Sequence, residues 1–321
     1  MTETAHAILL VGAGELGSRH LQSLASLAGC QIDVIEPSAA ACQTAATRLA
    51  QVTVVAEVNF FQSFDVLKSS YDVAIIATSA AVRFEVTQQL LSKTKLKYLI
   101  LEKVLFQRPE YYQALQHQLA AHQVSAFVNC PRRLYPLYRQ LKARLSDGPV
   151  SITVSGENWG MACNSIHFLD LLMYLTEEHL SVIDTTALQD SFASKRPGFL
   201  EVSGRLVARF QSGSTVTLQC ETNDTNTARV AIELQSAAGH WRIDEAKGRL
   251  ECLDSGTLLL DGLPMLFQSQ LTAHVAHKLL QHGSCDLTSY SDSAVLHLPL
   301  INSLLAYFNK TQGPMDLCPI T

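Results

Sequence analysis

The stretch "AILLVGAGELGSRHLQSL", Ala7–Leu24, decides the fold of this chain. Its apolar start has the continuous hydrophobic character of a buried parallel strand, and its end has helical spacing. Between the two, Gly12, Gly14 and Gly17 form a GxGxxG pattern. Gly12 permits the tight turn, Gly14 lets backbone approach a pyrophosphate, and Gly17 lets the helix pack on the strand. The pattern predicts a turn that binds the phosphates of a dinucleotide.

The nature of that dinucleotide is indicated by Glu36, which follows Gly17 by 19 residues at the end of the second strand, "QIDVIEP". A carboxylate there accepts hydrogen bonds from the adenosine ribose and repels a 2′-phosphate, so NAD is favoured over NADP. Glu15 and Leu16, between the glycines, belong to the same predicted cofactor site because the helix N-terminus presents its N–H groups to phosphate. The alternative is a glycine-rich turn in a Rossmann-like domain that binds no dinucleotide.

The rest of the chain divides into two patterns. Up to about residue 128, buried strands such as "YDVAIIATS", "KYLILEKV" and "VSAFVN" alternate with helices, one of them capped by Ser38. Such alternation predicts an α/β Rossmann domain with a parallel, doubly wound sheet. From about residue 150, strands such as "STVTLQCET" and "RVAIELQS" follow one another, with helices near 165–175, 268–282 and 291–309. We therefore expect a Rossmann domain over 1–125 and an α+β domain with a mostly antiparallel open sheet over 126–321.

Composition excludes several classes of protein. The 321 residues are 47% hydrophobic and 17% charged, which is typical of a globular protein. A net charge of −5 argues against a nucleic-acid partner, which needs clustered Lys and Arg. No apolar run reaches the roughly 18 residues of a membrane span, and no basic leader precedes the first strand. The eight cysteines contain no CxxC pair, so we expect reduced thiols and a cytoplasmic location.

A lysine marks the end of the fifth strand. "YLILEKVLF" is apolar until Glu102 and Lys103 appear together. Ligands of open parallel sheets lie beyond the carboxyl ends of the strands, so these two residues, with Thr78 after the preceding strand, complete the predicted cofactor site. An ammonium group there can hydrogen-bond a substrate hydroxyl or carbonyl and assist proton transfer. The alternative is a surface ion pair at a strand end.

A second candidate region is "ENWGMACNSIHFLDLLMYL", Glu157–Leu175. If Asn164 or Ser165 caps the helix, His167 lies in its first turn, where the helix dipole favours neutral imidazole that can accept a proton. Asp170 would hold that ring or pair with a Lys or Arg. The alternative for His167 is a core histidine satisfied by its neighbours. Trp159 lines the cleft or packs in the core.

The chain resembles the glucose–fructose oxidoreductase/inositol dehydrogenase/MocA family in "VGAGELGSRH", "YDVAIIATSAAVRFEV", "LEKVLF", "CPRRLYPLY" and "NSIHFLDLLMYL". The resemblance spans roughly the first 175 residues and implies that Lys103 is catalytic. The chain departs from the family pattern at Val104, where relatives have proline, at Arg83, where they often have histidine, and at Cys163, where they often have aspartate. Arg132 and Arg133 fall where the family often places an arginine.

The sequence thus predicts an NAD-dependent oxidoreductase acting on a sugar, polyol or sugar-derived acid. Its expected catalytic residues are Lys103, His167 and Asp170, and its expected substrate residues are Arg133, Trp159, Cys163, Asn164 and His167. Two alternatives stay open: an NAD-using glycosidase with no net redox change, and a cofactor-binding regulator that has lost catalysis.

Two further expectations concern partners. The resemblance implies a homodimer or homotetramer formed through the C-terminal sheet. The segment "AHVAHKLLQHGSC" carries His274, His277, His282 and Cys285, but its spacing matches an amphipathic helix ending at Gly283 better than a zinc site, so we expect no metal.

Overall fold

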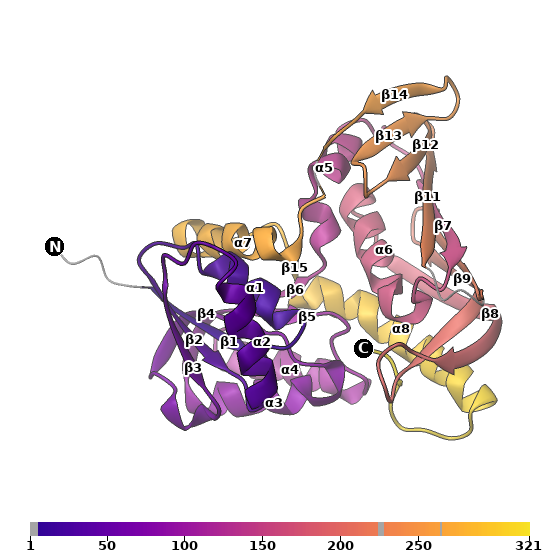
Figure 1. Cartoon of the computed structure of the whole chain (residues 1–321). Coiled ribbons are helices and arrows are strands. Elements are labelled where there is room, and N and C mark those ends of the chain that lie inside the picture. Colours follow the sequence, from indigo (N-terminus) through magenta and orange to yellow (C-terminus); the bar gives the residue numbers. More distant parts are fainter. Residues whose placement is uncertain (1–5, 224–227, 264) are drawn as a thin grey trace. The chain divides into compact units, whose positions relative to one another are not determined.

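A computed structural model describes residues 6–223, 228–263 and 265–321 (Figure 1). The chain forms two compact units. The first comprises the chain up to Phe106 together with Glu110–Asn129 and Leu266–Ser291, and the second comprises Gln107–Pro109, Cys130–Met265 and Asp292–Thr321. The sequence was expected to divide once, between residues 125 and 126, whereas the two units alternate along the chain.

The first unit contains the predicted parallel sheet, which confirms the Rossmann class. Its strand order is β15-β6-β5-β4-β1-β2-β3, and only β15 is antiparallel to its neighbour. From β1 the chain builds outward in one direction and then, from β4, in the other, so the strand order reverses between β1 and β4. The elements are β1 (His6–Val11), α1 (Gly17–Leu24), β2 (Cys30–Ile35), α2 (Ala39–Leu49), β3 (Glu57–Phe61), η1 (Phe64–Val66), β4 (Ser70–Ile76), α3 (Ala80–Lys93), β5 (Lys95–Glu102), α4 (Glu110–Ala121), β6 (Ser125–Asn129), α7 (Gln268–His282) and β15 (Thr288–Ser289).

The core of this unit follows from its central strands. Residues 8–10 of β1, 73–76 of β4 and 99–101 of β5 are almost completely buried. Continuous apolar runs of this kind are required where helices cover both faces of a sheet. Ser38 caps α2 as expected, since its hydroxyl accepts a hydrogen bond from the Ala41 N–H at 3.3 Å.

Helix α7 belongs to the first unit although its sequence lies more than a hundred residues after β6. It packs against α1. At this contact the Ala273 N–H donates to the Ser23 hydroxyl at 2.8 Å, and the His20 ring bonds the Thr272 hydroxyl at 2.9 Å. The predicted helix near 268–282 is present, but its place on the first unit was not visible in the sequence pattern.

The second unit contains an eight-stranded sheet in the order β14-β13-β12-β11-β7-β10-β9-β8. Its pairs are antiparallel except for β7 and β10, so the predicted mostly antiparallel sheet is confirmed. Helix α6 packs on β9 and β10. The elements are η2 (Pro131–Leu134), α5 (Pro136–Lys142), β7 (Ser151–Glu157), α6 (Met161–Thr176), β8 (Leu180–Ala193), β9 (Leu200–Phe210), β10 (Thr215–Glu221), β11 (Arg229–Ser236), β12 (Gly239–Asp244), β13 (Arg249–Cys252), β14 (Thr257–Leu260) and α8 (Tyr290–Thr311), which begins in the first unit.

The long strand β8 was not predicted. Half of its sequence, "LSVIDTTALQDSFA", is polar, and its pairing with β9 contains three register shifts. Because each shift moves the following side chains to the other face, no regular alternation marks the strand in the sequence. Strands β3 and β14 were missed as well.

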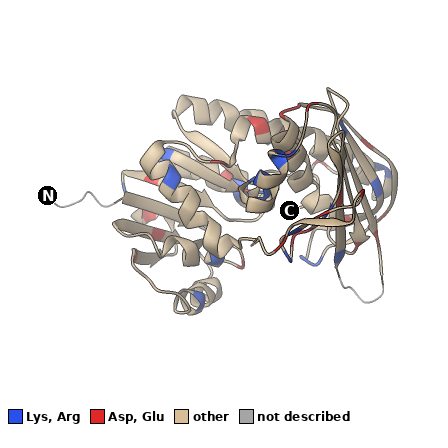
Figure 2. Cartoon of the chain, turned by 90° about the horizontal axis from the view of Figure 1, so that it is seen from above, with Lys and Arg blue, Asp and Glu red and all other residues tan. Residues whose placement is uncertain are grey.

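The surface carries both signs of charge. Figure 2 shows Lys and Arg residues interspersed with Asp and Glu residues on both units. Among the helices of the described residues, none is long and apolar enough to span a membrane.

Candidate functional site

The glycine turn after β1 has the geometry that close backbone packing requires. Gly12 adopts a φ of 89°, which favours glycine. A Cβ on Gly17 would lie 1.9 Å from the Gly12 carbonyl oxygen, so only glycine lets α1 begin this close to the turn. A Cβ on Gly14, in contrast, would meet nothing within 4 Å. Gly14 therefore leaves open space beside the backbone, and this is where a pyrophosphate would approach.

Glu36 is tied directly to the glycine turn. Its carboxylate accepts hydrogen bonds from the Ala13 N–H at 2.7 Å and from the Ser38 N–H at 2.9 Å. The side chain is 9% exposed, at the end of β2. Because each carboxylate oxygen has two lone pairs, these bonds fix the orientation of the group and still leave acceptor capacity for a ribose hydroxyl.

Glu15 and Leu16 contribute to the turn through their backbone. Arg48 of α2 donates to the Glu15 carbonyl and to the Ser18 hydroxyl at 2.9 and 2.7 Å. The same guanidinium bonds the Glu15 carboxylate, which lowers the pKa of that carboxyl. Leu16 is the residue preceding α1. Arg48 thus braces the glycine turn from the neighbouring helix.

The remaining predicted cofactor residues lie at the carboxyl ends of adjacent strands. Thr78 follows β4, and Lys103 follows Glu102, the last residue of β5. β4 and β5 are paired in parallel through Ile76 and Leu101, so both turns lie at the same edge of the sheet as the glycine turn. Lys103 is half-buried, and its peptide bond to Val104 is cis.

Glu102 faces the interior of the first unit. It is 3% exposed, and its Oε1 accepts hydrogen bonds from His20 Nε2 at 2.8 Å and from the amide of Asn129. Burial alone would raise the pKa of Glu102, but the bonds from His20 and Asn129 and the nearby charge of Arg83 hold that pKa below its ordinary value. The carboxylate is therefore an ionised part of a buried network immediately before Lys103.

In the second unit, α6 begins earlier than predicted. It starts at Met161, preceded by Gly160 with a φ of 71°, so neither Asn164 nor Ser165 is its cap. Their side chains instead bond backbone carbonyls, Asn164 that of Trp159 at 2.8 Å and Ser165 that of Met161 at 2.6 Å. Consequently His167 lies in the second turn, and the expected effect of the helix dipole on its ring is weaker than a first-turn position would give.

The N-terminus of α6 is capped by a side chain of a strand that follows it in the sequence. Glu201 of β9 is 5% exposed, and its Oε2 accepts a hydrogen bond from the Ala162 N–H at 2.8 Å. A carboxylate at this position satisfies an N–H group of the first turn and complements the positive end of the helix. Glu201 thus takes the role expected of Asn164 or Ser165.

Three predicted substrate residues share one face of α6. Among residues 161–170, only Cys163, Asn164 and His167 are partly exposed. Their spacing of i, i+1 and i+4 places them together on the helix surface. Cys163 contacts the Gly160 carbonyl at 3.4 Å through its sulfur.

Asp170 pairs with Arg133 of η2. Its two oxygens accept from Nε at 3.0 Å and from Nη2 at 2.7 Å, and Asp170 is completely buried. The ion pair with an arginine, one of the two alternatives predicted for Asp170, is present in the structure. The neighbouring Arg132 makes a similar two-bonded pair with Glu245, at 2.7 and 3.0 Å.

Trp159 is part of the core packing. It is 7% exposed, its ring stands edge-on to Phe168 at 5.9 Å between centroids, and its Nε1 donates to the Gln219 carbonyl at 3.0 Å. These contacts match the packing alternative for this residue.

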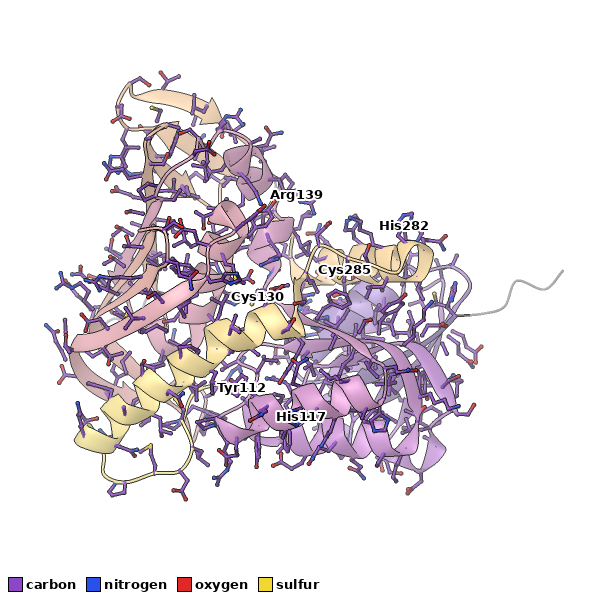
Figure 3. The ribbon with its side chains drawn as sticks, turned by 180° about the vertical axis from the view of Figure 1, so that it is seen from behind. Tyr112, His117, Cys130, Arg139, His282 and Cys285 are labelled. Atoms are coloured by element: carbon purple, nitrogen blue, oxygen red, sulfur yellow. The ribbon has the colours of Figure 1, made fainter. Side chains whose placement is uncertain are left out.

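No group of three or more His, Cys, Asp or Glu side chains among the described residues is arranged to hold a metal ion. Figure 3 shows His282 at the end of α7 and Cys285 just beyond it. Gly283 follows α7 with a φ of 74°, the left-handed C-cap that the sequence predicted.

Sequence reasoning missed Glu201, His20 and Asn129. A glutamate in the apolar stretch "LEVSGRLVARF" could have indicated a functional residue. However, the strand alternation that puts Leu206 and Ala208 on the inner face of the sheet predicts Glu201 on the outer face. Gly204, with a φ of 94°, interrupts that alternation next to a register shift in β8. His20 and Asn129 belong to α1 and β6, two elements that the sequence predicted. No local pattern in the sequence indicates that these two residues bond Glu102.

Residues 6–130 match the model of an oxidoreductase family described by its NAD-binding Rossmann fold. The match includes the glycine turn and Glu36, so the part of the first unit from β1 to β6 resembles the NAD-binding Rossmann fold of that family. The resemblance of the chain to the glucose–fructose oxidoreductase/inositol dehydrogenase/MocA family is thereby confirmed. No curated protein matches the chain.

Solved structures share the fold along nearly the whole chain. An oxidoreductase from Agrobacterium radiobacter in complex with NAD⁺, L-tartaric acid and magnesium has a TM-score of 0.72 at 16% identity, covering 97% of this chain and 98% of the other. A UDP-N-acetylglucosamine 3-dehydrogenase from Acidithiobacillus ferrooxidans has a TM-score of 0.71 at 14% identity, covering 94% and 96%. The scyllo-inositol dehydrogenase of Lactobacillus casei, with bound NAD(H) and scyllo-inositol, has a TM-score of 0.67 at 15% identity, covering 96% and 98%.

Proposed function

We propose that this chain is an NAD-dependent oxidoreductase acting on a hydroxyl or carbonyl group of a sugar, polyol or sugar-derived acid. The observation that carries the proposal is the glycine turn of the first unit. Gly14 leaves open space for a pyrophosphate, and the turn is hydrogen-bonded at Ala13 to the Glu36 carboxylate, which is oriented for a ribose. The residues present therefore fit a dinucleotide without a 2′-phosphate.

Lys103 is proposed to mediate proton transfer. NAD, when bound, supplies a hydride acceptor or donor at its nicotinamide ring. Lys103 lies at the carboxyl edge of the sheet, one residue after the fixed carboxylate of Glu102. Its amine would take a proton from the substrate hydroxyl during oxidation and return one to the carbonyl during reduction. In the second unit, the half-buried face of α6 carries His167, which is proposed to take part in proton transfer, and Asn164, which is proposed as a hydrogen-bonding group for hydroxyls.

The structural relatives support the substrate class. Their bound or named ligands, L-tartaric acid, scyllo-inositol and a UDP-sugar, all carry secondary hydroxyl groups. Cys163 is less able than a carboxylate to orient a polyol, so hydroxyl recognition in this chain would rest more on Asn164.

The test is reduced-nicotinamide absorbance with NAD against a panel of sugars, polyols, sugar acids and nucleotide sugars. Lys103→Met should abolish turnover and leave NADH binding, measured by fluorescence, intact. Lys97→Met is the matched control, because Lys97 is an exposed lysine on β5, the strand that Lys103 follows.

Turnover retained in Lys103→Met would refute the role of the lysine. Cofactor retained through purification, with glycoside hydrolysed and no NADH accumulating, would favour the glycosidase alternative. Binding of NADH without turnover on any substrate would favour the regulator, and Cys163→Asp would then be the first variant to test.

The outer face of the C-terminal sheet is proposed as the contact between copies of the chain. This face carries Arg205, Gln219, Glu221 and Arg229, and a groove of about 410 Å³ crosses β7, β10 and β11. Both signs of charge on one patch allow an isologous contact in which each copy pairs Arg with Glu of the other. Sedimentation should show a dimer or tetramer that Gln219→Arg weakens; a monomer at micromolar concentration would contradict the proposal.

A further inference from the structure

Arg83 is a buried cation that contributes its charge near Glu102 but has no other role in the site described so far. It lies in the first turn of α3 and is 2% exposed. A positive charge is unfavourable at this end of a helix, where the dipole is also positive. Burying a guanidinium is costly unless its N–H groups are hydrogen-bonded. The stability of the helix therefore does not explain why an arginine is buried at this position. The explanation must come from the groups to which Arg83 donates hydrogen bonds.

Those partners are backbone carbonyls of two separate turns. One nitrogen, Nη1, donates to the carbonyls of Val104 and Leu105, the latter at 3.0 Å. The other, Nη2, donates to the carbonyl of Thr78. The planar fork of a single guanidinium thus joins the turn after β4 to the turn after β5, at the edge of the sheet where the ligand is proposed to bind.

Lys103 lies inside the segment that this fork holds. Immediately before it, Glu102 is fixed by His20 and Asn129. Immediately after it, the Val104 carbonyl is fixed by Arg83. Further on, the Tyr112 hydroxyl of α4, labelled in Figure 3, accepts from the Phe106 N–H at 3.3 Å and donates to its carbonyl at 2.9 Å. The backbone on both sides of Lys103 is therefore fixed by buried side chains.

We propose that Arg83 is a positioning residue that sets the place of the Lys103 amine relative to the Thr78 turn. The inference rests on the proposed function of Lys103 and adds the residue on which its geometry depends. Displacing a reacting group by about 1 Å costs roughly a hundredfold in rate, so loss of the fork should lower turnover much more than cofactor binding. The fork also needs an arginine, because a lysine ammonium cannot bond carbonyls of both turns with fixed geometry.

The experiment compares Arg83→Met and Arg83→Lys with Leu90→Ala, a matched control that removes buried surface from the same helix. Hydrogen–deuterium exchange of peptides covering 77–79 and 103–106 reports on the two turns. Acetylation of Lys103, followed by mass spectrometry with exposed Lys97 as internal reference, reports on the amine. Neither readout needs a substrate. Where the substrate panel gives turnover, kcat and KM are measured together with NADH affinity.

In Arg83→Met we expect exchange to be about tenfold faster at both turns, and the acetylation rate of Lys103 to change about threefold or more relative to Lys97. We expect kcat to fall about tenfold to a hundredfold, with NADH affinity changed less than about threefold. Arg83→Lys should resemble Arg83→Met, and Leu90→Ala should resemble the parent.

Exchange and acetylation in Arg83→Met equal to those in Leu90→Ala would overturn the proposal. A kcat equal to that of the parent in an Arg83 variant whose two turns show faster hydrogen–deuterium exchange would also overturn the proposal. If no substrate gives turnover, the proposed function fails, whereas the exchange and acetylation data still decide whether Arg83 places Lys103.

Discussion

The ion pair between Asp170 and Arg133 makes a quantitative prediction about the second unit. Asp170 is completely buried, the Arg133 side chain is 13% exposed, and the two groups share bonds of 2.7 and 3.0 Å. Asp170→Asn keeps the volume and one acceptor but removes the charge. It leaves a buried guanidinium facing an amide that cannot neutralise it.

The size of the effect follows from burial. Two charges about 4 Å apart interact by about 4 kcal/mol at an effective dielectric constant of about 20. Measured losses on breaking a buried pair by removing one partner are about 3–5 kcal/mol. Because asparagine retains one acceptor, we expect Asp170→Asn to lose about 3 kcal/mol of the free energy of unfolding.

Urea unfolding followed by tryptophan fluorescence is the assay. The chain has two tryptophans, Trp159 and Trp241, and both lie in the second unit, so the signal reports on that unit alone. The control is Glu177→Gln, which breaks the pair of Lys142 with an 81% exposed Glu177 and should change the free energy of unfolding far less than Asp170→Asn does.

A double-mutant cycle separates the pair from other effects. Arg133→Met combined with Asp170→Asn removes both charges, so it should cost about 1–3 kcal/mol less than the sum of the single variants. A loss below about 1 kcal/mol in Asp170→Asn, or strict additivity in the cycle, would refute the reasoning that this pair fixes η2 to α6.

Three further predictions concern the first unit. Gly14→Ala should unfold at the same temperature as the parent but bind NADH more weakly, whereas Gly17→Ala should lose stability because its Cβ would lie 1.9 Å from the Gly12 oxygen. Thermal melts measure the stability of both variants, and fluorescence titration measures their NADH affinity. Unchanged NADH affinity in Gly14→Ala would exclude close approach of the pyrophosphate at Gly14. The parent should bind NADH more tightly than NADPH, and Glu36→Ala should narrow the gap; equal affinities in the parent would rule out the assignment of Glu36. Because the folded pKa of Glu102 is lowered, its ionised form stabilises the fold above the ordinary value of about 4.3, and this stabilisation is lost as the pH falls from there toward the folded pKa. By calorimetry, Glu102→Gln should therefore be less stable than the parent near neutral pH and approach it in acid, and a constant difference across that range would contradict the network.

The Rossmann sheet could be predicted because its signals are local. Continuous apolar strands, the glycine turn and the Ser38 cap each depend on a few neighbouring residues, and all three appear in the structure. Pairings across the sequence could not be predicted in this way. Glu201 caps a helix that begins 40 residues earlier, and Arg83 acts on the turn 21 residues later, so neither role leaves a periodic pattern.

In the second unit, local sequence preference predicted the wrong residues as the cap of α6. Asn164 and Ser165 have the residue types of helix caps, and local preference favoured them. The helix nevertheless starts at Met161, because the buried carboxylate of Glu201 satisfies the N–H of Ala162. A tertiary contact therefore replaced the local one.

The return of α7 to α1 has a consequence for how the chain is synthesised. Domains generally fold as units in the order in which they leave the ribosome. Here α1 and the buried His20 have emerged long before Thr272 and Ala273, which bond them in the folded chain. The dinucleotide domain thus stays incomplete until nearly the last tenth of the chain is made. A fragment ending at residue 130 would contain the whole family match and yet leave the α7-facing side of α1 open to water or to another chain.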